Sequence, residues 1–205
     1  MTERRKQFVP GAVRHDYETI GEWIRPGTKV LDLGCGDGSL LRYLAENRSV
    51  RGYGVEIDDA NILACIRNSV NVIQSDLESG LSGFESGSFD YVILSQTLQA
   101  MKNTKSIIRE MIRVGREGIV TFPNFGYWQN RIQILRGHMP VSGNLPYEWY
   151  DSPNIRLCTT WDFESFCAKH GVNILERVVM TNGEIISFLP NLLGSLAVFR
   201  FTKGG

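Results

Sequence analysis

The sequence lacks a surplus of either charge. Its 205 residues include 22 lysines and arginines and 22 aspartates and glutamates, so the formal net charge is zero. Proteins bind nucleic acids largely by neutralising phosphates with basic side chains, and a balanced chain is therefore a poor candidate for that role. The cluster Arg4-Arg5-Lys6 is better explained as a solvated terminus than as a binding arm. We expect no nucleic-acid partner.

Cysteine and histidine are scarce as well, with four and three copies. No two cysteines form a Cys-x-x-Cys pair, which favours reduced packing residues in a cytoplasmic protein over disulfides or a zinc site. The histidines show neither Glu-x-x-His nor His-x-x-x-His spacing, so no metal site is expected. His15 precedes the first expected strand, where an N-terminal helix could cover a ligand, although a surface histidine is the simpler interpretation.

Long apolar runs, repeats and low-complexity tracts are also missing. The most apolar stretches, near Ile185 and Leu193, are interrupted by Pro190 and Asn191 and are too short to span a bilayer. No signal peptide is recognised. With 42% hydrophobic and 21% charged residues, residues 1–205 are expected to form a single domain with a substantial core, located in the cytoplasm without membrane contact.

What the chain does contain is a strand, a glycine-rich turn, a helix and a second strand within residues 29–59. The first strand ends at Leu33 and is followed by glycines at positions 34, 36 and 38. Residues 39–48 have the apolar spacing of a helix, and residues 51–57 form a second strand that carries Glu56 near its end. This order is typical of a βαβ unit that holds an adenosine-containing ligand at a helix N-terminus.

Strands and helices continue to alternate along the chain. Further strands are expected over 70–74, 89–94 and 118–122, and further helices over 13–24, 58–68, 105–114 and 161–170. In the helix over 58–68, we expect Ile62, Leu63 and Ile66 to face inward. Two final strands, 173–180 and 195–202, have no helix between them and should pair antiparallel. The expected fold is a three-layer αβα, Rossmann-like α/β fold with a mostly parallel seven-stranded sheet and an antiparallel last strand.

Residues 124–159 break this alternation. Residues 129–135 could form a helix, and five large aromatic side chains surround it: Tyr127, Trp128, Tyr147, Trp149 and Tyr150. A long aromatic connection in a compact domain is usually a lid or a contact surface. Both interpretations of this insertion stay open.

The glycine spacing distinguishes two kinds of cofactor. A dinucleotide fingerprint needs glycine at the first, third and sixth positions of the turn, but the sixth position here is Ser39. S-adenosylmethionine has no phosphate, and its ammonium group needs an acid, which Asp32 can supply. Its ribose diol needs an acceptor at the end of the second strand, where Glu56 lies. Its adenine amino group needs an acceptor after the third strand, where Asp76 lies.

We therefore expect S-adenosylmethionine, or S-adenosylhomocysteine, as the cofactor. The candidate binding residues are Asp32, Gly34, Cys35, Gly36, Glu56, Ile57, Asp76, Leu77 and Ser95. The acids also have structural interpretations, since Asp32 could cap a loop, Glu56 could be a surface acid and Asp76 could form an Asx turn. Cys35 could be a reactive thiol at a helix N-terminus, although a small filler beneath the ligand is the simpler interpretation.

No catalytic base is evident. Substrate residues on such a scaffold usually follow the fourth strand, but residues 95–99 contain no acid, no histidine and no Asn-Pro-Pro-Tyr clamp. The stretch after the fifth strand is rich in aromatic and amide side chains without a base. The residues therefore predict cofactor binding and leave open whether the chain is an enzyme.

Several stretches together resemble the MetW family of methionine-biosynthesis proteins. Three are shared with many methyltransferases and lie at 30–38, 52–58 and 71–77. The others single out this family: Ser-Gln-Thr-Leu-Gln at 95–99 within 89–99, Phe-Pro-Asn-Phe-Gly at 122–126, and Pro-Tyr-Glu-Trp-Tyr-Asp at 146–151 leading to 153–155. They follow in the right order over residues 14–180, which is more specific than any single motif.

The resemblance implies a class I methyltransferase fold and an association with homoserine O-acyltransferase, as its partner or activator. The family commonly has a histidine where this chain has Tyr127, so an acid–base role at that position is not expected here. The alternative is a genuine S-adenosylmethionine-dependent methyltransferase of small molecules, with residues 96–99 and the aromatic segment forming its substrate pocket.

Overall fold

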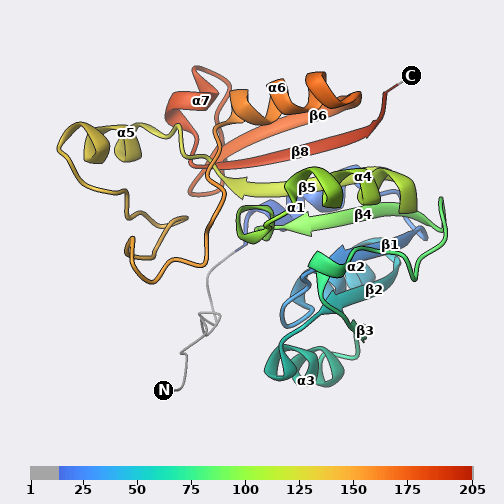
Figure 1. Cartoon of the computed structure of the whole chain (residues 1–205). Helices are drawn as coiled ribbons and strands as arrows, with labels where there is room; N and C mark the ends of the chain where they lie inside the picture. Colours follow the sequence, from blue (N-terminus) through green and yellow to red (C-terminus); the bar gives the residue numbers. More distant parts are fainter. Residues whose placement is uncertain (1–13, 205) are drawn as a thin grey trace.

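A computed structural model describes residues 14–204 (Figure 1). The Arg4-Arg5-Lys6 cluster and position 13 of the first expected helix lie outside the described residues. The strands are β1 (Lys29–Leu33), β2 (Arg51–Glu56), β3 (Asn71–Gln74), β4 (Phe89–Ser95), β5 (Gly115–Pro123), β6 (Val172–Thr181), β7 (Glu184–Ile185) and β8 (Leu196–Lys203). The helices are α1 (Asp16–Trp23), α2 (Ser39–Arg48), α3 (Asp59–Arg67), α4 (Thr104–Val114), α5 (Trp128–Leu135), α6 (Thr160–His170) and α7 (Pro190–Leu193), with short 3-10 turns η1 (Leu77–Ser79) and η2 (Leu98–Ala100).

The strands form one mixed sheet in the order β3-β2-β1-β4-β5-β8-β6-β7. The first five pair in parallel, and β8 lies antiparallel between β5 and β6. The expected three-layer α/β fold is therefore confirmed. The sheet has eight strands within the described residues rather than the expected seven, because the two-residue β7 pairs with the end of β6. The expectation of no helix before the last strand was also wrong, because α7 forms one turn there.

Helices cover both faces of the sheet because alternate side chains of each strand point to opposite faces. Val30 of β1 packs in a core with α1 and α2, whereas Leu31 packs in a second core with α4 and α6. Aromatic rings fill this second core, where Phe163 of α6 lies 4.8 Å from Phe199 of β8 between ring centroids. In Figure 1, α6 lies along β6 and β8, and α4 lies beside β4 and β5.

The helix termini carry sequence signals that explain where they form. Asp58 caps α3 by accepting from the backbone N–H groups of Ala60 and Asn61. Thr159 and Asp162 form a capping box at the start of α6, and Gly171 ends that helix with φ +65°. Side-chain oxygens satisfy N–H groups that have no partner within the first turn, and glycine adopts the left-handed C-cap without a steric penalty.

The orientation of α3 differs from the expectation. Leu63 and Ile66 are 54% and 62% exposed, and the buried residue of this helix is Cys65. The helix packs at the edge of the sheet, against the four-residue strand β3. Because β3 has only four residues, it covers only part of the apolar side of α3. The prediction that Ile62, Leu63 and Ile66 all face inward was therefore wrong.

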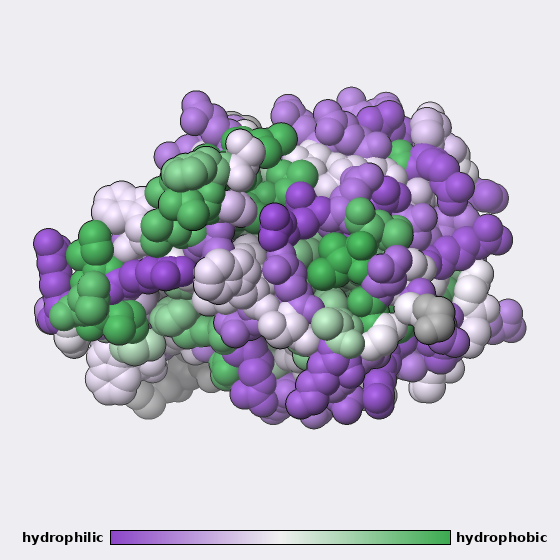
Figure 2. Space-filling view, turned by 90° about the horizontal axis from the view of Figure 1, so that it is seen from above, coloured by the Kyte–Doolittle hydropathy of each residue, from purple (hydrophilic) through white to green (hydrophobic). Residues whose placement is uncertain are grey.

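Residues 124–159 extend from the end of the sheet where β5 finishes, and they carry α5 (Figure 1). Tyr127 is buried at the start of this insertion, whereas Trp149 and Tyr150 are 74% and 71% exposed. Figure 2 shows hydrophobic side chains gathered over the end of the molecule that carries α5 and α7. Exposed side chains at that end include Leu135, Phe188 and Leu189.

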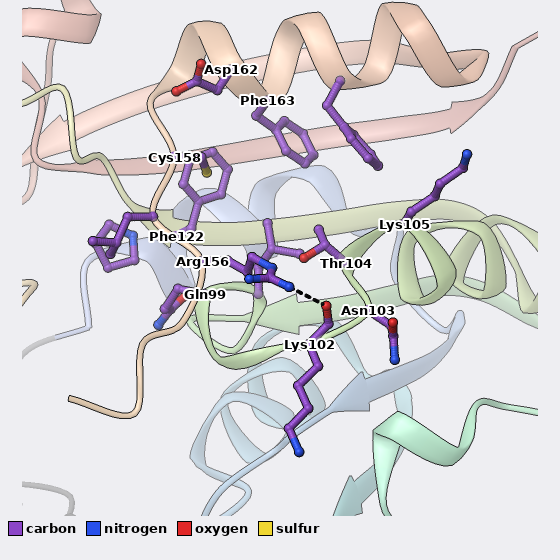
Figure 3. A pocket seen from close by; sticks show the side chains of 14 residues that line it. Gln99, Lys102, Asn103, Thr104, Lys105, Phe122, Arg156, Cys158, Asp162 and Phe163 are labelled. Atoms are coloured by element: carbon purple, nitrogen blue, oxygen red, sulfur yellow. Dashed lines mark hydrogen bonds between the residues drawn. The ribbon is translucent and has the colours of Figure 1, made fainter. Parts of the chain in front are cut away.

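Hydrogen bonds hold one end of the insertion to α7 and the residue that follows it, and the other end to η2. The Asn124 side chain is fully buried, and its Nδ2 donates to the carbonyls of Asn191 and Gly194 at 3.1 and 2.7 Å. At the other end, the backbone N–H groups of Ile155 and Arg156 both donate to the Gln99 carbonyl at 2.9 Å. Arg156 Nη2 also donates to the Lys102 carbonyl at 3.1 Å (Figure 3).

Within residues 14–204, none of the helices combines the length and the apolar character that a membrane crossing requires.

Candidate cofactor site

The carboxyl ends of the parallel strands bring the predicted acids to one edge of the sheet. Leu33 of β1 pairs with Val55 of β2, which places Asp32 and Glu56 on adjacent strand ends. Both side chains are buried, with exposed fractions of 2% and 8%. Ligands of open α/β sheets bind outside this edge. The interpretation of Glu56 as a surface acid does not fit this burial.

Glu56 joins the glycine turn to the end of β2. Its Oε2 accepts from the Gly36 N–H at 2.9 Å, and its Oε1 accepts from the N–H groups of Ile57 and Asp58 at 2.8 and 3.0 Å. These three bonds fix the orientation of the carboxylate. A carboxylate oxygen accepts more than one hydrogen bond, so capacity remains for the two hydroxyls of a ribose.

Asp32 has an oxygen without a partner. The side chain is buried, yet Oδ1 makes no hydrogen bond. Burial raises the pKa of Asp32 to about 8, against the lowering effect of the Arg14 charge and with a further rise from Glu56. A buried acceptor without a partner is costly. A cationic ligand group beside Asp32 would satisfy this oxygen, so the site fits the ammonium of S-adenosylmethionine.

The glycine turn is closed towards the sheet and open at its tip. The N–H groups of Gly34 and Cys35 donate to the Val55 carbonyl at 2.8 and 3.1 Å. A Cβ on Gly34 would lie 2.9 Å from the Thr97 side chain, whereas a Cβ on Gly36 would meet open space. Both glycines have positive φ, +68° and +57°. The backbone at Gly36 can therefore be approached closely by a ligand.

The Cys35 side chain points away from this edge. It lies in the core beneath α2 and α3, with its Sγ 3.7 Å from Cys65 Sγ. Burial, followed by the charge of Asp32, raises the pKa of the Cys35 thiol. A buried thiol with a raised pKa is unreactive. Cys35 thus has the geometry of a packing residue, and its backbone carbonyl accepts from the Gly38 N–H at 3.0 Å.

Asp76 follows β3 and is exposed at the start of η1. Its Oδ1 accepts from the Glu78 N–H at 2.9 Å, so the structural alternative of a local turn is present. The second carboxylate oxygen can accept an adenine amino group at the same time. Leu77 is partly buried against the sheet, and Ile57 is 52% exposed beside Glu56. Both are apolar surfaces of the kind on which a base packs.

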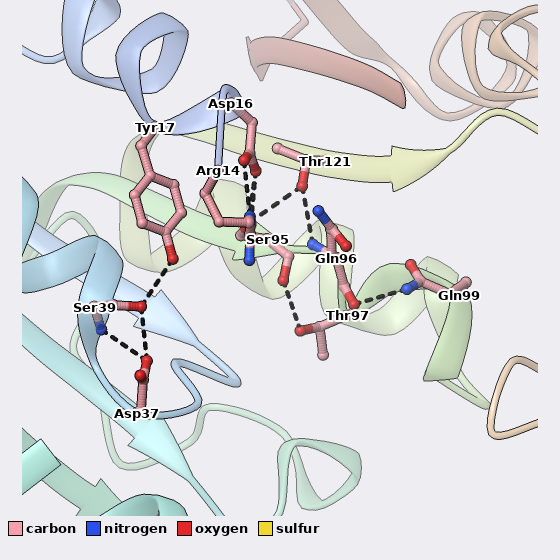
Figure 4. Close-up of polar contacts among 10 residues, drawn as sticks. All are labelled: Arg14, Asp16, Tyr17, Asp37, Ser39, Ser95, Gln96, Thr97, Gln99 and Thr121. Atoms are coloured by element: carbon pink, nitrogen blue, oxygen red, sulfur yellow. Dashed lines mark hydrogen bonds and ion pairs between the residues drawn. The ribbon is translucent and has the colours of Figure 1, made fainter. Parts of the chain in front are cut away.

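Ser95 takes part in a polar network that joins β4 to the start of α1 (Figure 4). Arg14 Nη2 donates to Ser95 Oγ at 2.7 Å, and the same guanidinium makes two bonds to Asp16, at 2.8 and 2.6 Å. Thr121 Oγ1 lies 3.2 Å from Ser95 Oγ. Ser95 therefore supports the site wall, with its hydroxyl already engaged.

Arg14 and Asp16 were missed by the sequence analysis. Asp16 is only 1% exposed, and Arg14 acts on the Asp32 carboxyl through its charge. The start of α1 also reaches the glycine turn, because Tyr17 Oη lies 3.0 Å from Ser39 Oγ. The one available signal was the position of this helix before β1. The neighbouring His15 is exposed, as the simpler interpretation predicted.

Residues 95–99 separate two cavities. Gln96, with a φ of +49°, lines a cavity of about 500 Å³ together with Arg14, His15 and Tyr127. Gln99 lines a second cavity of about 470 Å³ on the side of α4 and α6. Neither cavity includes Asp32, Glu56 or Asp76 among its lining residues. Among residues 14–204, no cluster of histidine, cysteine and acidic side chains could hold a metal ion.

Solved structures share this fold. A methyltransferase from Haloferax volcanii, in complex with the Trm112 methyltransferase activator, matches with a TM-score of 0.67 and 13% identity over 93% of this chain and 90% of that one. A methyltransferase from Thermotoga maritima matches with a TM-score of 0.64 and 17% identity, covering 92% and 88%. The [4+2]-cyclase SpnF matches at 0.66 with 18% identity, covering 92% and 80%. Because this last neighbour is a cyclase, the shared fold alone does not assign methyl transfer.

The sequence relatives indicate the family of this chain more specifically than the solved structures do. The bifunctional methionine biosynthesis protein MetXA/MetW of Rhodopirellula baltica is 38% identical over 202 residues, which cover 92% of this chain and 32% of the relative. A demethylmenaquinone methyltransferase of Bacillus cereus is 28% identical, covering 60% and 57%. The chain thus spans about a third of the length of the first relative and somewhat more than half of the length of the second. The family model described as methionine biosynthesis protein MetW matches residues 14–201. The chain belongs to the MetW family.

Proposed function

We propose that this methyltransferase-like protein of methionine biosynthesis binds S-adenosylmethionine or S-adenosylhomocysteine, and that it acts as the partner and activator of a homoserine O-acyltransferase. The observation that carries the cofactor proposal is the unpartnered oxygen of the buried Asp32, beside an open glycine turn. The four cysteines of the protein are free thiols. Free thiols are typical of proteins in the reducing cytoplasm, where we place this protein.

Each part of the cofactor has a counterpart at this edge. Asp32 would accept from the ammonium group, and the backbone of Gly34 and Gly36 would contact the amino-acid end. Glu56 would accept from the ribose hydroxyls, and Asp76 from the adenine amino group. The cofactor supplies a sulfonium-bound methyl group when it is bound. The protein residues orient it and exclude water from it.

The partner proposal is supported by the relative from Rhodopirellula baltica, whose name joins MetXA and MetW in one protein. We take the MetXA part to be the acyltransferase. A surface for such a partner is available on the insertion, where Trp149 and Tyr150 are 74% and 71% exposed. Tryptophan and tyrosine are enriched among the residues that dominate binding energy at interfaces. The insertion would then be a docking surface rather than a lid.

The second candidate function is methylation of a small molecule. The cavity beside Gln96 favours it, because this cavity adjoins Ser95 at the cofactor edge and is lined by polar groups of Asn144, Thr181 and Ser195. Its lining also includes His15, an exposed side chain. Turnover of the cofactor to S-adenosylhomocysteine in the presence of a metabolite extract would favour this function over the first.

Two measurements test the proposal. Isothermal titration with S-adenosylmethionine should detect binding to the wild type and its loss in Asp32→Asn, with Glu85→Gln as the control because that acid is exposed and is not among the candidate binding residues. Purification of the tagged chain from its host should recover the homoserine acyltransferase. Cofactor binding without the acyltransferase would retain the first half of the proposal and reject the second.

A further inference from the structure

The cavity between α4 and α6 has no role in the functions proposed above. It has a volume of about 470 Å³, which lies within the range of small-molecule sites. Its walls are the segment from η2 to the start of α4, the end of β5, the returning end of the insertion, and α6. In Figure 3, Phe122, Cys158 and Phe163 face this space from three of these walls.

The inner part of the cavity is apolar. Phe122 and Phe163 are 1% and 3% exposed and form its floor, and Phe166 and Leu98 complete it. Cys158 adds a thiol whose pKa burial raises to about 12, so it is neutral and apolar in character at physiological pH. This part would take up a hydrocarbon or aromatic body of a ligand through the hydrophobic effect.

The rim of the cavity is cationic. Lys105 of α4 and Arg156 of the returning end of the insertion are exposed side chains that line it, and Lys102 also lines it. Among the ion pairs of residues 14–204, none involves these three side chains. An acid, Asp162, lies on the rim too, but its Oδ2 accepts from the N–H and hydroxyl of Thr159. Three cations and one carboxylate therefore line the cavity, which is an excess of positive charge in a chain whose total charge is zero.

Two further features of the rim are suited to an anion. The α4 helix has 11 residues, starts at the rim, and has neither a side-chain cap nor an acid in its first turn. The hydroxyl Oγ1 of Thr104, the first residue of that helix, is buried without a hydrogen-bond partner. Unpaired N–H groups and the helix dipole attract negative charge at such a position. A hydroxyl that lacks a partner there can donate to the same anion.

We propose that this cavity is a second ligand site, which binds a small molecule with an apolar body and one carboxylate or phosphate group. The apolar body lies against Phe122, Phe163 and Phe166, and the anionic group lies between Lys105, Arg156 and the start of α4. The lining of this site includes none of Asp32, Glu56 and Asp76 and neither Trp149 nor Tyr150, so the site is distinct from the cofactor edge and from the aromatic residues proposed for the partner. Because Arg156 lies at the returning end of the insertion and is bonded to the carbonyls of Gln99 and Lys102, a bound anion would also contact the insertion.

Calorimetric titration of the full chain with octanoate, octyl phosphate and octan-1-ol tests this proposal. The preferred anion should bind about tenfold more tightly than the alcohol, since hydrogen bonds to a charged group contribute about 1.5–3 kcal/mol. Comparing octanoate with octyl phosphate identifies the head group. Arg156→Gln and Lys105→Gln should each weaken anion binding by about threefold to tenfold and leave octan-1-ol binding unchanged.

Matched variants complete the design. Arg67→Gln removes an exposed cation from α3, on the other side of the sheet, and should change nothing. Thr104→Val keeps the shape of its side chain, should weaken anion binding, and should not lower the melting temperature, because the hydroxyl has no partner to lose. Equal binding of the alcohol and both anions, equal binding by all variants, or displacement of the anion by S-adenosylhomocysteine would each overturn the proposal.

Discussion

Asp32 should govern how the candidate cofactor site responds to pH. In the unfolded chain this carboxyl ionises near its ordinary pKa of 3.8, whereas in the folded protein burial raises the pKa to about 8. Between these two values the folded state holds a proton that the unfolded state has lost. The free energy of unfolding therefore falls as the pH rises from about 4 to about 8, and it levels off above that range.

Replacing Asp32 with asparagine should remove this dependence. Near pH 8 and above, the Asp32→Asn variant without cofactor should be more stable than the wild type by on the order of 2 kcal/mol, because no buried carboxylate has to be ionised. The same variant should lose cofactor binding. Urea unfolding at about pH 5 and about pH 9 measures the effect. Parallel pH dependence of the variant and the wild type would contradict it, and Glu85→Gln serves as the control.

Cofactor binding should release a proton at neutral pH. An ammonium group beside Asp32 favours the ionised carboxylate and lowers its pKa, so the proton held by the free protein leaves on binding. Calorimetric titrations with S-adenosylmethionine in two buffers of different ionisation enthalpy should give different apparent enthalpies for the wild type. Identical enthalpies in the two buffers would show that Asp32 does not take part in this way.

The sequence predicted that Asp32 and Glu56 lie together, but it did not predict which residues support them. The two acids were placed together because each lies near the end of an apolar strand, and parallel strands end at one edge of the sheet. Their role in binding the cofactor stays a prediction. Arg14 and Asp16 were missed because their role depends on where the start of α1 lies relative to β4. No local pattern reports that contact, which joins residues 81 positions apart.

At the scale of elements, Asn124 connects the end of β5 to α7. Its side chain donates to two carbonyls, and its Oδ1 accepts from the Gly126 N–H at 3.0 Å. Asn124→Ala should destabilise the fold by about 2–3 kcal/mol, because buried carbonyls and an N–H lose their partner. Thermal unfolding measures this loss. Asn173→Ala, at an exposed position of β6, should have little effect, and equal melting temperatures for both variants would be inconsistent with this role.

The insertion should bind the partner through its exposed aromatic residues. Trp149→Ala and Tyr150→Ala should each weaken the complex with the acyltransferase by about tenfold or more, as truncation of interface hot spots does. Both should retain full affinity for the cofactor. Trp161→Ala is the matched control, since Trp161 is 64% exposed but lies on α6 outside the insertion. Surface plasmon resonance with the immobilised acyltransferase measures the affinities, and a loss as large for the control would contradict a role of the insertion.

Elements with a strong periodic pattern were predicted well, and those set by tertiary packing were not. Residues 39–48 form α2 as expected, because three leucines lie on one face and Gly38 precedes them. The two-residue β7 and the four-residue α7 are too short to show any period. Leu63 and Ile66 are exposed because β3, the strand at the sheet edge against which α3 packs, has only four residues. Periodicity finds an apolar face but does not say how much of it the sheet covers.

At the scale of the whole molecule, the cofactor edge, the two cavities and the insertion are linked through residues 95–99. Ser95 is bonded to the start of α1, and the Gln99 carbonyl holds the returning end of the insertion. If the cofactor and the acyltransferase each bind better in the presence of the other, this link provides a physical connection between the two sites. Such coupling is reciprocal by thermodynamic necessity. Since S-adenosylmethionine is made from methionine, the cofactor would report the output of the pathway to its early enzyme.

The most direct measurement is the rate of homoserine acylation by the acyltransferase, alone and with this chain, across a titration of S-adenosylmethionine. The wild-type chain should raise the rate, the increase should depend on cofactor concentration, and Asp32→Asn should remove this dependence. A rate that is the same with and without the chain, at every cofactor concentration, would contradict the proposed role as a cofactor-dependent activator.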